Sequence, residues 1–145
     1  MGNHMFQFAS ALGIARSKGM IPVITEYFPL RKIFKLVVRV VPIDSLIFDR
    51  SRIITRVEEK AAIYDKKLVN FTNSHDVRLV SYLQSYLYFD KNSSELRKQF
   101  LFKDNIQSEA NKTMKRVLNR FKIISRQKVT LIGVHVRRGG YAGEN

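Results

Sequence analysis

The sequence contains no cysteine, so disulfide bonds, a thiolate nucleophile and a cysteine-based zinc site are all excluded. Histidine is almost as scarce. Only His4, His75 and His135 carry an imidazole, and they lack the close spacing of a metal-binding motif. The sequence therefore predicts no metal site and no bound cofactor.

Acidic residues are also few: 12 Asp and Glu stand against 26 Lys and Arg, which gives a formal net charge of +14. A charge of this size indicates an anionic partner (nucleic acid, membrane headgroups or a phosphorylated small molecule), or else only a solvated basic surface. The basic residues are scattered and form no stripe with interleaved aromatic residues. We therefore do not expect nucleic acid as the partner.

Long hydrophobic runs are missing as well. The longest apolar stretch, Leu36–Val41, is interrupted by Arg39 and is too short to cross a bilayer, and no signal peptide is visible. Three triplets, beginning at Asn70, Asn92 and Asn111, fit the N-glycosylation pattern N-x-[ST]. These sequons hint at a lumenal protein, although no targeting segment accompanies them.

The residues that are present alternate between helix-type and strand-type patterns, which is typical of an α/β layer. The expected helices cover residues 2–19, 76–90 and 104–124, and the expected strands cover 20–25 and 129–136. Residues 29–56 fit either a helix or a strand, and residues 57–75 are polar and expected to be irregular. The order of elements predicts a partial Rossmann-like parallel sheet with covering helices.

The last expected strand ends in a paired charge, "VTLIGVHVRRGGY" over residues 129–141. Ligands of open parallel sheets bind beyond the carboxyl ends of the strands, where Arg137 and Arg138 follow. Guanidinium groups suit phosphate oxygens, and the glycines after them let backbone approach a ligand closely. The pair is either a phosphate site or two solvated arginines, and His135 is either a structural residue or part of the cleft.

The first expected helix offers a second candidate site. Gly2 and Asn3 form a turn with a possible N-cap before the helix, and Gly19 marks its end. A glycine turn that opens a helix presents N–H groups and a positive dipole end to a phosphate. The alternative is an ordinary N-capped helix, because no GxGxxG or P-loop pattern is present.

Three separated stretches together resemble one family. "GNHMFQFA" (2–9), "SYLQSYLYF" (81–89) and "HVRRGGY" (135–141) are similar to "LGNQMFQYA", "GYFQSYKYF" and "HxRRGDY" of the GDP-fucose-dependent α-1,2-fucosyltransferases, glycosyltransferase family 11. The resemblance spans essentially the whole chain but only about the first half of a family catalytic domain. It implies the N-terminal half of a GT-B-type enzyme that transfers fucose from GDP-fucose to a glycan galactose.

The resemblance also implies roles for single residues. Arg137 would bind the donor pyrophosphate and stabilise the departing GDP. Arg138 would support it or pair with a carboxylate. Gly2 and Asn3 would line the cleft between donor and acceptor, and His135 would lie in the same wall of that cleft. The catalytic residues would be Arg137 and Asn3. The stretch 81–89 is interpreted as structural. The family acts without a metal, usually in the Golgi lumen, and would meet the membrane only through an anchor.

Two of the departures from the family motifs matter for the site. His4 replaces a glutamine, and Gly140 replaces an aspartate. The first strand, the membrane anchor and the second domain of the family are not recognisable in residues 1–145. We therefore expect an incomplete N-terminal fucosyltransferase-like domain with little or no transferase activity as a 145-residue chain. The alternatives are a non-catalytic nucleotide- or glycan-binding remnant and a basic nucleic-acid-binding domain.

Overall fold

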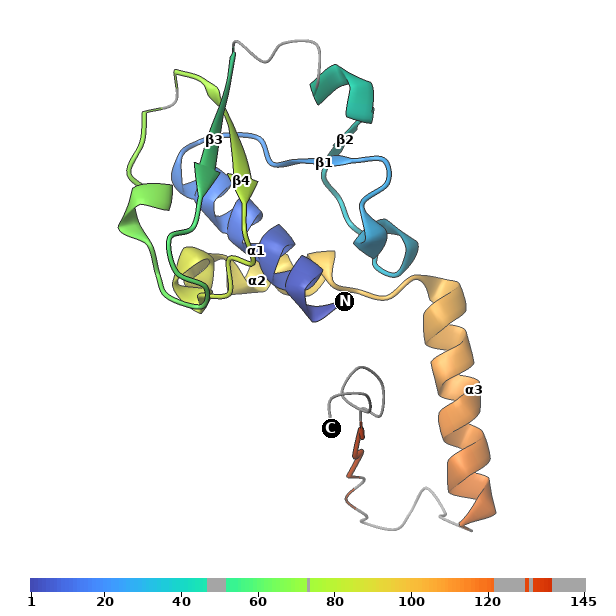
Figure 1. The fold of residues 1–145 in the computed structure, drawn as a ribbon. Coiled ribbons are helices and arrows are strands. Elements are labelled where there is room, and N and C mark those ends of the chain that lie inside the picture. The colour runs from blue at the N-terminus through green and yellow to red at the C-terminus, as the bar shows by residue number, and fades with distance from the viewer. Residues whose placement is uncertain (47–51, 73, 122–129, 131, 137–145) are drawn as a thin grey trace, which may run out of the picture. The chain divides into compact units, whose positions relative to one another are not determined.

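The structure is a computed structural model that describes residues 1–46, 52–72, 74–121, 130 and 132–136 (Figure 1). The chain divides into two compact units, Met1–Ser108 and Glu109–Asn145. The boundary falls within the helix α3 (Asp104–Arg120).

The first predicted helix is confirmed as α1 (Gly2–Ser17). It ends as its sequence predicts, because Gly19 adopts a φ of +64° that few other residues tolerate. The Gly19 N–H donates to the Arg16 carbonyl at 3.2 Å, and the Met20 N–H donates to the Ala15 carbonyl at 2.8 Å. These two bonds satisfy carbonyls that the end of a helix leaves open.

The predicted N-cap of this helix is wrong. Met1 precedes the first helical residue and makes no side-chain cap, so Gly2 and Asn3 lie inside the first turn of α1. The Asn3 side chain is therefore available for a contact outside its own helix.

Parallel strand pairs confirm the α/β class. β1 (Val23–Thr25) pairs in parallel with β2 (Arg39–Val41), and β3 (Ile53–Val57) pairs in parallel with β4 (Asp76–Val80). Within the described residues these pairs form two separate two-stranded sheets. β3 and β4 run side by side in Figure 1 and end together, with Val57 opposite Val80.

The predicted helix over residues 76–90 is wrong. Residues 76–80 form β4, in which Val77 and Leu79 are half-buried between exposed neighbours, as in a strand with one covered face. A turn follows, and then a short 3-10 helix, Tyr86–Tyr88. The apolar residues of this stretch have helical spacing only by coincidence, because they belong to a strand and a turn.

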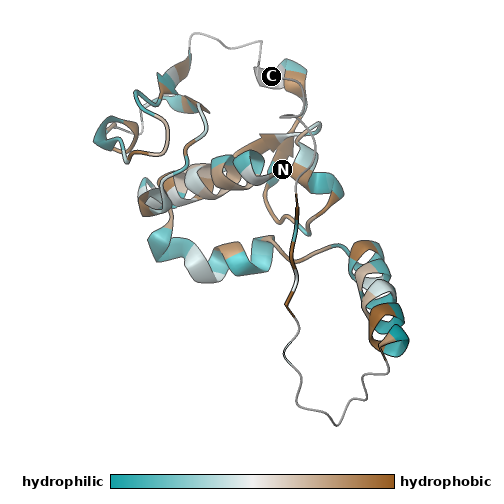
Figure 2. Cartoon of the chain, turned by 60° about the horizontal axis from the view of Figure 1, so that its bottom comes forward, coloured by the Kyte–Doolittle hydropathy of each residue, from teal (hydrophilic) through white to brown (hydrophobic). Residues whose placement is uncertain are grey.

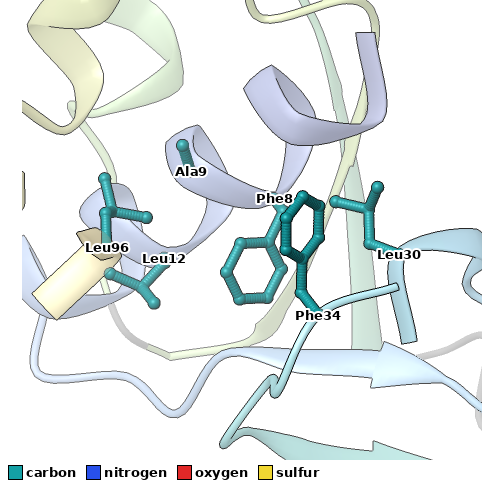
Figure 3. Packing of buried hydrophobic residues seen from close by; sticks show 6 residues of the cluster. All are labelled: Phe8, Ala9, Leu12, Leu30, Phe34 and Leu96. Atoms are coloured by element: carbon teal, nitrogen blue, oxygen red, sulfur yellow. The ribbon is translucent and has the colours of Figure 1, made fainter. Parts of the chain in front are cut away.

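Two hydrophobic clusters share α1. The first contains Phe8, Ala9, Leu12, Leu30, Phe34 and Leu96 (Figure 3). The second contains Ile14, Leu68, Leu83 and Tyr88. Burial of such side chains stabilises a fold by about 1.5–3 kcal/mol each. α1 is therefore the element around which the first unit is built.

Close contacts fix α1 against its neighbours. Gly13 lies against the backbone of Tyr88 and Phe89, where a Cβ atom would meet the Tyr88 carbonyl oxygen at 2.2 Å. α2 (Ser93–Gln99) is joined to α1 by Arg16, whose Nη2 lies 2.6 Å from Oε1 of Glu95. The hydrogen bond from Arg16 lowers the pKa of Glu95 below its ordinary value.

The predicted helix over residues 104–124 is confirmed as α3 within its described part. No described residue of α3 is buried, and Met114, Val117 and Phe121 expose large apolar surfaces. Figure 2 shows hydrophobic and hydrophilic residues around α3. The pattern is amphipathic, as the spacing of its apolar residues predicts.

The predicted strand over residues 129–136 is not found among its described residues, Thr130 and 132–136. Ile132, Val134 and Val136 are 69–83% exposed rather than buried. A strand needs a partner for its backbone groups, and none of the described residues of the second unit provides one. The alternating apolar pattern is present without the sheet that it predicts.

Candidate functional site

The first two motifs of the resemblance meet in the structure. Residues 81–85, which follow β4, lie along α1 and are joined to it by three side-chain hydrogen bonds. Nε2 of Gln84 donates to Oδ1 of Asn3 at 2.9 Å, Nε2 of Gln7 donates to the Ser81 carbonyl at 2.8 Å, and Oγ of Ser10 donates to the Leu83 carbonyl at 2.8 Å. Asn3, Gln7 and Ser10 have the spacing of one helix face. We call residues 81–85 the α1-contact loop.

Glu58 also forms hydrogen bonds with the α1-contact loop. Its Oε2 accepts a hydrogen bond from the Leu83 N–H at 3.1 Å, and its own N–H donates to Oγ of Ser81 at 3.1 Å. Glu58 directly follows β3, and Ser81 directly follows β4. The loop therefore sits at the carboxyl ends of a parallel strand pair, where ligands of α/β proteins bind.

The Glu58 carboxylate is itself unusual. The residue is 7% exposed, and its Oε1 has no hydrogen-bond partner among the described residues. Sequence reasoning missed it, because "VEEK" at 57–60 has the composition of an ordinary solvated turn. The only signal was its position as the first residue after an apolar strand.

The loop holds a strained backbone conformation. Leu83 has a φ of +54°, which is uncommon for a residue with a bulky side chain, and it is 2% exposed. Its N–H and carbonyl are both bonded to side chains, those of Glu58 and Ser10. Such strain persists only where the surroundings over-determine it, and it concentrates at functional sites.

A tyrosine hydroxyl anchors the segment after the loop. The Tyr88 hydroxyl accepts a hydrogen bond from the Asp65 N–H at 2.8 Å, and its ring lies 5.0 Å from that of Tyr64. Burial raises the pKa of Tyr88. This contact fixes the stretch 81–89 to the chain between β3 and β4.

The structure places the other predicted site residues as follows. Gly2 and Asn3 are exposed at the start of α1, and a Cβ atom on Gly2 would meet nothing within 4 Å. His4, which replaces the family's glutamine, packs its ring edge-on against Phe28 at 6.0 Å. His135 is exposed in the second unit. Arg137, Arg138 and Gly140 lie outside the described residues.

The described residues contain no group of three or more His, Asp or Glu that could hold a metal ion. No helix in the described ranges is long and apolar enough to span a bilayer.

The three sequons differ in their surroundings. Asn70 and Thr72 are exposed in a loop after the 3-10 helix Lys66–Leu68. Asn92 is half-buried at the end of a 3-10 helix, and Asn111 lies within α3. N-glycosylated asparagines are typically in surface loops. Asn70 therefore fits the modification better than the other two.

Expression of the chain behind a secretory leader is expected to give one N-glycan, at Asn70. Digestion with an N-glycosidase should raise gel mobility by one step, and Asn70→Gln should abolish that step. Asn92→Gln is the matched control and should leave it unchanged. A glycan that survives Asn70→Gln would contradict the assignment.

The chain is thus an α/β protein with a polar cluster at the carboxyl ends of a parallel strand pair. Residues 1–144 match the model of the family described as Glycosyl transferase family 11. The chain belongs to this family, as its motifs predict.

The galactoside alpha-(1,2)-fucosyltransferase 2 of Mus musculus is 26% identical to this chain over an alignment that covers 97% of the chain. The chain spans 39% of that protein's length. No solved structure matches the chain.

Proposed function

We propose that the chain is part of a galactoside α-1,2-fucosyltransferase, which transfers fucose from GDP-fucose to a galactose hydroxyl of a glycan. The family match over residues 1–144 carries the proposal, and the named activity of the mouse relative supports it. The compartment proposed with it is the Golgi lumen. The proposed architecture is the Rossmann-like N-terminal half of a GT-B-type enzyme.

The proposed chemistry needs a stabilised leaving group. Negative charge grows on the GDP phosphate as the bond to fucose breaks, and fixed cations near that phosphate lower the barrier. Arg137 is proposed for this role. Arg138 is proposed to support Arg137, and His135 is proposed to lie in the same wall of the donor–acceptor cleft. A guanidinium fork suits a diphosphate because it donates two parallel hydrogen bonds and stays charged.

Asn3 is proposed to contact the acceptor glycan. It lies in the first turn of α1, is exposed, and is held by Gln84 from the α1-contact loop. Gly2 beside it leaves room for a ligand, because no described atom beyond its neighbours in the helix lies within 4 Å of its missing Cβ. A carboxamide in this position can orient a sugar hydroxyl without adding charge.

Binding of GDP is the step that tests the proposal on these residues. Calorimetry of the full 145-residue chain with GDP should detect binding, and Arg137→Ala should weaken it about 10- to 100-fold. This range corresponds to the loss of a charged hydrogen-bond pair worth about 1.5–3 kcal/mol.

Arg97→Ala is the matched control, because Arg97 is an exposed arginine on α2. It removes the same charge and should leave GDP binding unchanged. Equal loss in both variants would indicate a non-specific effect of net charge. An Arg137→Ala variant that binds GDP normally would contradict the proposed role.

A further inference from the structure

The two longest stretches without Asp, Glu, Lys or Arg are brought into contact by the fold. They are residues 1–15 and 79–89, in a chain where 26% of residues are charged. The hydrogen bonds from Asn3, Gln7 and Ser10 to the α1-contact loop join these two stretches. The contact is therefore an uncharged region in a strongly basic protein.

Burial explains only part of this absence of charge. Phe8 and Leu83, for example, are buried and apolar for that reason. Asn3 is exposed, however, and Tyr82 and Tyr86 are 53% and 64% exposed. These exposed positions are therefore accessible to a ligand and carry no charge. A surface of this kind suits a ligand without charge.

The exposed polar atoms suit a hydroxyl-rich ligand. The Asn3–Gln84 bond uses Oδ1 of Asn3 and Nε2 of Gln84. It leaves the donor Nδ2 of Asn3 and the acceptor Oε1 of Gln84 without a hydrogen bond to any described residue. A hydroxyl group both donates and accepts, so such a pair can bind sugar hydroxyls.

An exposed aromatic residue of the α1-contact loop, two positions before Gln84, suits the same ligand. Tyr82 and Gln84 flank the buried Leu83 in sequence; Tyr82 is 53% exposed and Gln84 is half-buried. A phenol ring offers a large apolar face with a polar end. The C–H face of a sugar ring packs on such a surface, while its hydroxyls reach the carboxamides.

The loop is preformed for binding. Glu58 and Ser10 hold the backbone of Leu83 at its positive φ, so the conformation does not depend on a ligand. Rigid recognition groups bind more tightly because less conformational entropy is lost on association.

We propose that Asn3, Tyr82 and Gln84 form the binding site for a neutral terminal sugar of the acceptor glycan. This inference rests on the proposed function and gives the α1-contact loop a role in recognition. The interpretation of residues 81–89 as purely structural is thereby revised for Tyr82 and Gln84, while Leu83 and Tyr88 are buried and keep a packing role.

Saturation-transfer NMR of the full chain with lactose tests the inference. We expect transfer to the galactose ring protons, and loss of most of that signal in Tyr82→Ala and in Gln84→Ala. Gln84→Glu keeps the size of the side chain but adds a charge, and it should weaken the signal as well. Circular dichroism of each variant verifies that the fold is intact.

Tyr27→Ala is the matched control, because Tyr27 is 71% exposed and lies outside the α1-contact loop. It should leave lactose binding unchanged. A folded Tyr82→Ala, Gln84→Ala double variant that still gives the full lactose signal would overturn the inference, as would absence of transfer in the unmodified chain. Neither result would affect the measurement of Arg137-dependent GDP binding. The lactose-binding inference and the proposed function are therefore tested independently.

Discussion

Replacing Gly13 with alanine is expected to destabilise the first unit by about 3 kcal/mol, which is a large part of the roughly 5–15 kcal/mol that keeps a typical domain folded. The new Cβ would lie 2.2 Å from the Tyr88 carbonyl oxygen and 2.7 Å from the Phe89 Cα. Both are backbone atoms, which cannot turn away as a flexible side chain can. α1 would have to move away from the stretch 81–89, with loss of the hydrogen bonds to the α1-contact loop.

Urea unfolding followed by circular dichroism measures this effect, and Gly2→Ala is the matched control. The same substitution in the same helix meets nothing within 4 Å at Gly2. Alanine is the better helix former, so this variant should be as stable as the original or slightly more stable. A Gly13→Ala variant of unchanged stability would mean that α1 does not approach Tyr88 closely.

Truncation of Leu83 is expected to give an unusual order of stabilities. Leu83→Ala removes a side chain that is 2% exposed and should cost about 3 kcal/mol. Leu83→Gly removes slightly more, yet it should be about 1 kcal/mol more stable than Leu83→Ala. The reason is the φ of +54°, which glycine adopts without strain and alanine does not.

Leu12 supplies the control for this comparison. It is completely buried in α1, where the backbone is helical. There the glycine variant should be less stable than the alanine variant by about 1 kcal/mol. The two positions thus predict opposite orders in the same unfolding assay. The same order at both positions would contradict the conformation assigned to Leu83.

The parts of the fold that depend on neighbouring residues were predictable from sequence. The apolar spacing of α1 and the glycine that ends it act within a few residues, so Gly19 marks the end of the helix correctly. The helix predicted over residues 76–90 failed because the strand β4 is stabilised by β3, about twenty residues earlier in the sequence. Pattern alone does not reveal that partner.

The candidate site also combines a residue that its local sequence predicts with residues whose place depends on tertiary packing. Asn3 was predicted from its motif, and its partner Gln84 lies in a second motif 81 residues away. Nothing local links the two, since the contact depends on how α1 packs against the loop. Glu58 was not predicted, because a carboxylate that is buried and bonded to a backbone N–H has the same sequence signature as one in water.

The sharing of α1 between two hydrophobic clusters couples the stability of the first unit to the α1-contact loop. Phe8 and Leu12 belong to one cluster and Ile14 to the other, while Ser10 bonds the loop. Any molecule that binds only the ordered loop therefore favours the folded helix, by an amount that grows with the logarithm of its concentration. Thermal stability becomes a reporter of occupancy, because helix, clusters and loop lose their order together.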